Sequence, residues 1–220
     1  ILSDVSLWLL MIMGFIIGLI GAYRVKMIEM PQAVALLNGF GGASSALVGV
    51  ITLTYFSGLS FFSILTSGLA IGVGMITLTG SLIAAAKLHK IISQKPIILK
   101  GHAVYTGTNL LLITLSIIGM PAASEKRGVL LVLSIVCLIV SGLFGIIFAI
   151  RVGGADMPIT ISLLNSLSGV AGSIAGMAIY DPLLVAIGGI VGASGLILTQ
   201  IMCRAMNRNL SNILLGKTSV

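Results

Sequence analysis

The feature that most constrains this chain is an uncharged stretch of 57 residues, from Met30 to Ala86. A helix crosses the hydrocarbon core of a bilayer, roughly 30 Å thick, in about 20 residues. The stretch is therefore too long for one crossing and long enough for two. Turn-forming residues at Ser57-Gly58 mark the expected break. The stretch predicts two consecutive membrane-spanning helices.

The composition extends this prediction to the whole chain. Of the 220 residues, 58% are hydrophobic and 8% are charged, whereas a soluble domain carries about 25% charged residues. This excludes a soluble enzyme, a disordered chain and a disulfide-linked secreted module. No segment alternates apolar and polar residues with a period of two, as barrel strands do. The expected fold class is all-α, a polytopic transmembrane helix bundle.

Charge-free segments predict about seven spans in this bundle. Their expected ranges are 5–23, 32–55, 61–86, 103–120, 128–150, 158–180 and 183–203.

Basic residues divide unevenly between the two sets of helix ends. One set collects Arg24, Lys26, Lys87, Lys90, Lys95, Lys100, Arg151, Arg204, Arg208 and Lys217. The other has Lys126 and Arg127, partly offset by Glu125. Because cytoplasmic loops are enriched in Lys and Arg, we expect the N-terminus outside and the C-terminus in the cytoplasm. The net charge of +7 is then explained by basic residues that set the membrane topology. No nucleic-acid partner is expected.

The chain begins with Ile1 and runs directly into a span, as expected of a fragment or processed piece. Residues 1–206 are expected to form the transmembrane domain, and the polar residues 207–220 a cytoplasmic linker. No nucleotide-binding motif or nucleophile motif is visible, so the chain is expected to bind no cofactor and to hold no catalytic residue. Cys137 and Cys203 lie in apolar segments without metal-ligand spacing, and no metal site is expected.

An internal repeat is the most informative pattern. At an offset of 127 residues, Arg24-Val25 aligns with Arg151-Val152, and the same register carries an acid followed by Met-Pro, then Leu-Leu-Asn, then two glycines. Nine of 26 aligned positions are identical. Four spans separate the copies, so both have the same orientation. Spans one to three therefore correspond to spans five to seven as parallel repeats.

The polar residues of the repeat allow two interpretations each. Glu29 and Asp156 precede Pro31 and Pro158, where an acid caps a helix and complements its dipole, or where it serves a functional role. Asn38 and Asn165 lie about 10 Å beyond these prolines along the helix. An unpaired amide in hydrocarbon costs several kcal/mol, so each asparagine either joins helices or lines a polar path.

Three glycines of the last span, Gly188, Gly192 and Gly195, recur at spacings of four and three. This spacing places them on one face and predicts close packing with a neighbouring helix.

The segments MPQAVALLNGFGG, GGADMPITISLLNSLSG and VGASGLILTQIMCRAMNRNL resemble the membrane domain of the β subunit of proton-translocating NAD(P) transhydrogenase. The resemblance implies a subunit fragment of a translocase. Members of the family couple hydride transfer between NAD(H) and NADP(H), in peripheral nucleotide-binding domains, to proton movement across the membrane domain. The implied setting is a dimeric assembly in a bacterial inner membrane, with α-subunit membrane helices and the NAD(H)- and NADP(H)-binding domains as partners.

The resemblance also implies roles for individual residues. Asn165 and Ser81 match residues of the proton channel, and Asn38 matches a position that is histidine in many members. A cytoplasmic gate or coupling role is implied for Glu29, Asp156, Arg204 and Arg208, and a small-residue packing face for Gly188, Gly192 and Gly195. Two N-terminal spans and the NADP(H)-binding domain of the family are absent from this sequence.

Two other functions are compatible with the residues alone. A secondary transporter would use the repeat to bind a small solute near the midplane. A passive membrane anchor would use the polar residues only to join helices.

Overall fold

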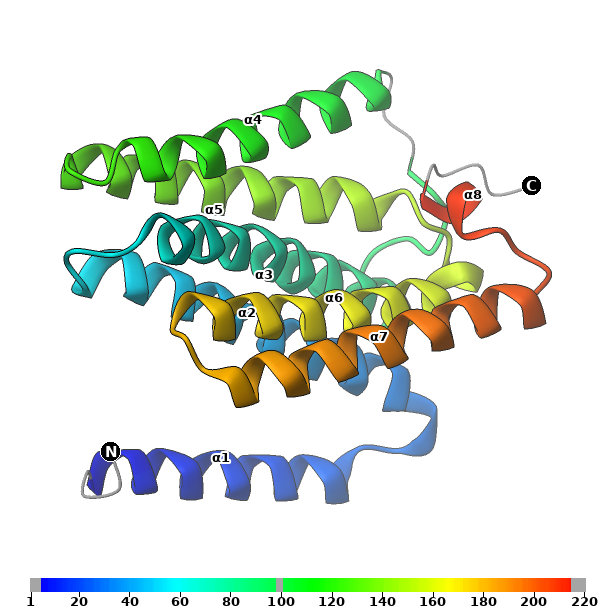
Figure 1. Cartoon of the computed structure of the whole chain (residues 1–220). Coiled ribbons are helices and arrows are strands. Elements are labelled where there is room, and N and C mark those ends of the chain that lie inside the picture. The colour runs from blue at the N-terminus through cyan, green and yellow to red at the C-terminus, as the bar shows by residue number, and fades with distance from the viewer. Residues whose placement is uncertain (1–4, 98–100, 215–220) are drawn as a thin grey trace.

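The computed structural model describes residues 5–97 and 101–214, and seven of its helices are long and apolar enough to cross a membrane (Figure 1). No strand occurs in this described part, so the all-α class and the seven predicted spans are confirmed. Lys100, Lys217 and the end of the predicted linker lie outside the described residues. The seven spans are α1 (Val5–Arg24), α2 (Met30–Tyr55), α3 (Phe61–Leu88), α4 (His102–Ala122), α5 (Arg127–Ile150), α6 (Met157–Ala178) and α7 (Pro182–Ala205).

Three short helices accompany the spans: η1 (Met27–Glu29), η2 (Gly154–Asp156) and α8 (Leu210–Leu214). The spans run alternately in opposite directions, and α1 begins at the end of the bundle opposite to the end where α7 finishes (Figure 1).

Local sequence sets the turns between spans. Gly58, at the predicted break, has a left-handed φ of +70°, which glycine adopts without strain. The Ser60 hydroxyl then accepts the N–H of Ser63 at 3.1 Å and caps α3. Before α7, the Asp181 carboxylate accepts the N–H groups of Leu183 and Leu184 at 3.0 and 3.1 Å. These caps satisfy backbone donors for which lipid offers no partner.

The two repeat copies fold alike, as two tightly packed hairpins. In each copy a 3-10 turn ends at the acid, and the following helix opens with Met-Pro. A Cβ added at Gly42 of α2 would lie 2.7 Å from the Gly74 carbonyl of α3, and one at Gly169 of α6 would lie 2.5 Å from the Gly192 nitrogen of α7. Because α3 also packs on α6, the hairpins α2–α3 and α6–α7 form a four-helix core.

The other three spans lie around this core. α5 packs on α3, where a Cβ at Gly145 would lie 2.6 Å from the Ile76 carbonyl, and α4 packs on α5. α1, the repeat counterpart of α5, stands apart from the bundle and buries none of its residues (Figure 1). The outer faces of the spans carry many exposed Leu, Ile, Val and Phe side chains, as expected of an integral membrane protein.

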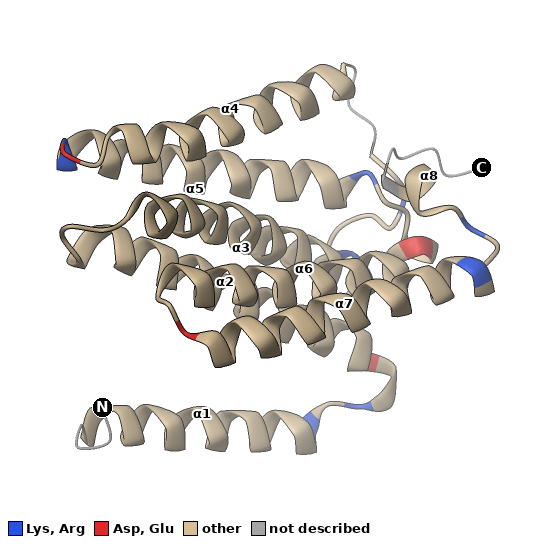
Figure 2. Ribbon diagram, viewed as in Figure 1, with Lys and Arg blue, Asp and Glu red and all other residues tan. Residues whose placement is uncertain are grey.

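Charge is segregated to the two ends of the bundle (Figure 2). Of the described Lys and Arg residues, only Lys126 and Arg127 lie at the end where α4 passes into α5. The others gather where α1, α3, α5 and α7 finish. This second end is called the basic end below.

Candidate functional site

Asn38 of α2 and Ser81 of α3 meet inside the first hairpin. Asn38 is 7% exposed and Ser81 is completely buried, and the Asn38 Nδ2 donates to Ser81 Oγ at 3.1 Å. The Asn38 Oδ1 is buried and accepts no hydrogen bond from any described residue. A carboxamide can donate twice and accept twice. The Asn38 side chain therefore retains an unfilled acceptor within the apolar part of the bundle.

Asn165 of α6 approaches the same level of the bundle from the second hairpin. Its side chain is half-buried. Ser168, three residues later and so on a similar face of α6, donates its hydroxyl to the Asn38 backbone carbonyl at 3.5 Å. The two asparagines thus lie on helices that pack directly on one another, and Ser168 links them.

Most other hydroxyl groups between α6 and α7 are already satisfied. Ser166 donates to the Gly192 carbonyl at 2.6 Å. Thr199 lies 2.9 Å from Ser162 Oγ and also donates to the carbonyl of Gly195 at 2.8 Å. The Ser166–Gly192 bond and the Thr199–Ser162 contact join α7 to α6, whereas the Thr199–Gly195 bond lies within α7. The unfilled polar capacity in this region is therefore that of the Asn38 amide and the half-buried Asn165 amide.

Asp156 forms a second polar centre at the basic end. Its side chain is 3% exposed and lies at the start of α6, with Oδ1 3.2 Å from Nε of Arg208. Arg208 follows the end of α7, so the ion pair joins the entrance of the second repeat to the segment after the last span. Arg204, one turn earlier, is exposed and does not reach Asp156. The two basic residues that the sequence grouped together therefore have different surroundings.

Glu29, the counterpart of Asp156, lies in an open setting instead. It lines a cavity of about 430 Å³ between the start of α2 and the end of α3, together with Gln32 and His89. The Gln32 Oε1 is buried there without a hydrogen-bond partner among the described residues. The two acids are thus equivalent in the repeat but not in their contacts.

The three glycines of α7 all face α6. A Cβ at Gly188 would lie 2.8 Å from the Gly169 carbonyl, one at Gly192 2.9 Å from the Val170 side chain, and one at Gly195 2.9 Å from Cα of Ser166. Any side chain at these positions would push the two helices apart.

Two basic residues at the basic end have contacts that the sequence did not indicate. Lys87 is completely buried, and its Nζ donates to the backbone carbonyls of Ile150 and Val152 at the end of α5. Arg151, between those two residues, is buried as well. In the sequence both residues appear only as topology charges, and burial of this kind leaves no local signal.

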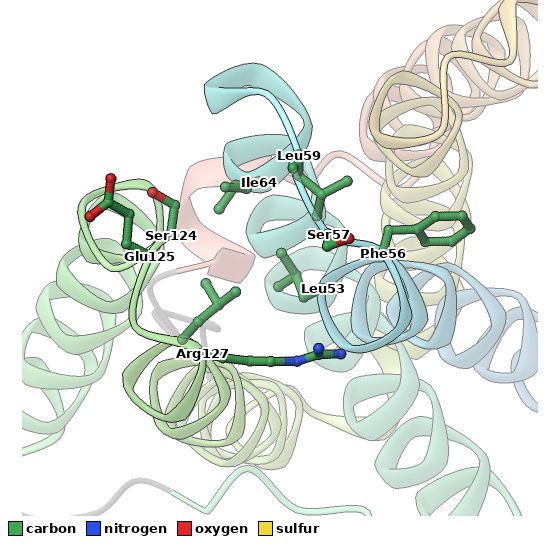
Figure 3. Close-up of a pocket in the computed structure, with 10 residues that line it drawn as sticks. Leu53, Phe56, Ser57, Leu59, Ile64, Ser124, Glu125 and Arg127 are labelled. Carbon is green, nitrogen blue, oxygen red and sulfur yellow. The ribbon is translucent and has the colours of Figure 1, made fainter.

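A further cavity, of about 310 Å³, lies at the opposite end of the bundle (Figure 3). It is lined by the turn after α2 and by the α4–α5 connection, including Glu125 and Arg127. Arg127 reaches across it to donate to the Thr54 carbonyl of α2. Within the described residues, no group of three or more His, Cys, Asp or Glu side chains could hold a metal ion.

Comparison with known proteins identifies relatives of the chain. A family model described as NAD(P) transhydrogenase beta subunit matches residues 2–220. Two curated relatives from Rhodospirillum rubrum, both named NAD(P) transhydrogenase subunit beta, are 36% identical over 211 residues. The match covers 92% of this chain and 44% of each relative. The chain therefore spans less than half the length of these relatives.

Proposed function

Because this chain belongs to the NAD(P) transhydrogenase beta subunit family, we propose that it forms the proton-conducting membrane domain of such an enzyme. In this proposal it moves protons across the bilayer, coupled to hydride transfer between NAD(H) and NADP(H) in partner domains. The observation that carries the proposal is the buried Asn38–Ser81 hydrogen bond, which leaves the Asn38 Oδ1 open inside the bundle. The family membership does not favour a solute transporter.

The proton path uses water held by amides and hydroxyls. Away from the helix ends the spans contain no Asp, Glu, Lys, Arg or His, so no side chain there can titrate near neutral pH. A water molecule at the Asn38 Oδ1 would donate one hydrogen bond to the amide oxygen and keep its second O–H and its lone pairs for neighbouring waters. Asn165, half-buried on α6, extends this chain of water molecules. Protons pass along the waters while the amides stay neutral.

Coupling acts through the Asp156–Arg208 ion pair at the basic end. The pair joins the start of α6, which carries Asn165, to the segment after α7. In longer family members that segment leads toward the NADP(H)-binding domain. A change in this domain that pulls on Arg208 would release the buried Asp156 carboxylate and shift α6 between two arrangements. Arg204, exposed one turn earlier, would contact the domain directly. Glu29 would have the coupling role at the start of the first repeat.

Partner helices fit beside α1 and the core. In the second repeat α5 packs on α3, the second helix of the preceding hairpin. α1 is the counterpart of α5, yet it buries none of its residues and stands apart from the described bundle. A helical hairpin from the α subunit would supply the missing surface. We expect the whole assembly to be a homodimer.

The remaining assignments follow from the same proposal. Residues 1–206 form the transmembrane domain and 207–220 the linker, with the N-terminus outside and the C-terminus in the cytoplasm of a bacterial cell. NADP(H) and NAD(H) bind in the partner domains, and this chain holds neither.

The proposal is tested by Asn38→Leu and Asn165→Leu, each introduced into the complete enzyme. Leucine has a similar volume but cannot hold water, so proton-coupled transhydrogenation should fall about tenfold or more. The rate and the proton flux are measured in vesicles with a pH-sensitive dye. Asn109→Leu is the matched control, because the Asn109 amide bonds only to the Tyr105 carbonyl of its own helix. Undiminished proton flux in both test variants would contradict the proposal and would mean that these polar residues only join helices.

A further inference from the structure

Arg151 is a buried positive charge at the basic end. It directly follows α5 and is 8% exposed, and its Nε is buried without a hydrogen-bond partner among the described residues. Its one described contact is with the Phe148 ring, whose centroid lies 5.7 Å from Cζ. The repeat counterpart, Arg24, is exposed to solvent. Burial therefore distinguishes Arg151 from a simple topology charge.

No acid in the described structure neutralises Arg151. Asp156, the nearest acid along the chain, is engaged by Arg208. The neighbouring cation Lys87 adds a second buried positive charge, with its Nζ donating to the carbonyls on either side of Arg151. Burial lowers the pKa of the Arg151 guanidinium, yet an arginine remains protonated in proteins. A buried charge without a counter-charge is costly, so this place calls for an anion.

The start of α4 lies at the same end of the bundle as Arg151 and carries further unpaired polar groups (Figure 1). His102 and Thr106 lie four residues apart on α4, on the face that is less exposed than its surroundings. Both ring nitrogens of His102 and the Thr106 Oγ1 are buried without a described partner, and α4 packs on α5, which Arg151 directly follows. The N-cap residue of α4, Gly101, offers no side-chain cap to the positive end of the helix dipole.

The position of these groups selects the kind of anion. They lie where α4 begins and α5 ends, and at the ends of apolar spans we expect the headgroups of a bilayer. Beside them α4 and α5 present exposed apolar side chains, among them Val104, Leu111 and Leu143, which suit acyl chains. Basic pockets between transmembrane helices at this level bind phosphate-bearing headgroups.

We propose that Arg151, His102 and Thr106 form a binding site for the phosphate of an anionic phospholipid. The guanidinium pairs with the phosphate oxygens, as arginine does at phosphate sites. The Thr106 hydroxyl and a His102 ring N–H donate to the same group. The acyl chains lie along the apolar faces of α4 and α5. The lipid would then seal the junction of these helices and neutralise the buried arginine.

The test compares melting of the purified, delipidated chain in detergent with and without phosphatidylglycerol. Wild type should melt about 5 °C higher with saturating lipid, and native mass spectrometry should detect the bound lipid. Arg151→Gln should lose both effects. Arg24→Gln is the matched control, because it removes the counterpart charge from the same end of the bundle without touching a buried group, and it should keep both effects.

Two further arms keep the test decisive. If Arg151→Gln does not fold, Thr106→Val, which keeps the side-chain shape, replaces it and should reduce the shift. Phosphatidylcholine with the same acyl chains should give no comparable shift, and neither should millimolar inorganic phosphate. An equal shift with either of them would overturn the anionic-lipid assignment. A full shift in the site variants, or none in wild type, would overturn the site and leave a carboxylate of a partner domain as the acceptor for Arg151.

Discussion

The two asparagines of the repeat occupy equivalent positions but differ in their hydrogen bonds. Asn38 is held by Ser81 of α3. The contact of Gly39 with Ser81 in the first hairpin corresponds to that of Ser166 with Gly195 in the second, so α7 has a glycine where α3 has this serine. Among the described residues Asn165 therefore has no matching hydroxyl partner, and its side chain is half-buried.

This difference predicts the effect of Ser81→Ala. The change removes the acceptor of the Asn38 Nδ2 and should lower the free energy of unfolding by about 1 kcal/mol, measured by unfolding in mixed detergent micelles. Ser67→Ala on the same helix is the control. Ser67 is also completely buried, but its Oγ has no described partner, so its removal should cost nothing. Equal losses in the two variants would mean that the Asn38–Ser81 bond adds no stability.

The sequence predicts some of these polar residues and not others. The repeat alone singles out both asparagines, because a paired amide in an apolar helix stands out. Ser81 follows only from the family resemblance, since a helical serine usually bonds to its own backbone. The burial of Lys87 and Arg151 was not predicted, because it depends on how α3, α4 and α5 pack, which no local pattern encodes.

At the scale of elements, the close approach of α6 and α7 depends on glycine. The seven spans and their turns are predictable from sequence, because span length, caps and turn residues are local properties. Which helices pack together is less local. The spacing of Gly188, Gly192 and Gly195 predicts a packing face but not its partner. The structure shows that this partner is α6, the other helix of the same hairpin.

This packing predicts opposite effects for two adjacent glycines. Gly188→Ala would place a Cβ 2.8 Å from the Gly169 backbone carbonyl, which cannot move aside like a flexible side chain. It should destabilise the protein by about 1–3 kcal/mol. Gly189→Ala meets nothing closer than the Ser173 Oγ at 3.9 Å and should be neutral or stabilising, because alanine favours helix. Thermal melting in detergent compares them, and similar melting temperatures would contradict this packing.

At the scale of the whole molecule, two features of the described chain lack a packing partner. α1 buries no residue, and the cavity beside Glu29 remains open. Both are expected if another subunit completes the bundle next to the first repeat. The sequence predicts α1 as a span but not its isolation, because a hydrophobic helix has the same pattern whether it faces lipid or protein.

The segregation of charge predicts how the molecule lies in its membrane. From the positive-inside rule we expect the basic end to lie in the cytoplasm. Single cysteines at Ser124, beside Glu125, and at Asn207, after α7, report on the two ends in a variant whose native Cys137 and Cys203 are replaced by alanine. In intact cells an impermeant maleimide should label Ser124→Cys, whereas Asn207→Cys should react only after permeabilisation. Ala123→Cys is a control for accessibility, because Ala123 lies at the same end but is buried and should react slowly in both conditions. The reverse labelling order would invert the proposed topology and place the Asp156–Arg208 pair outside the cell.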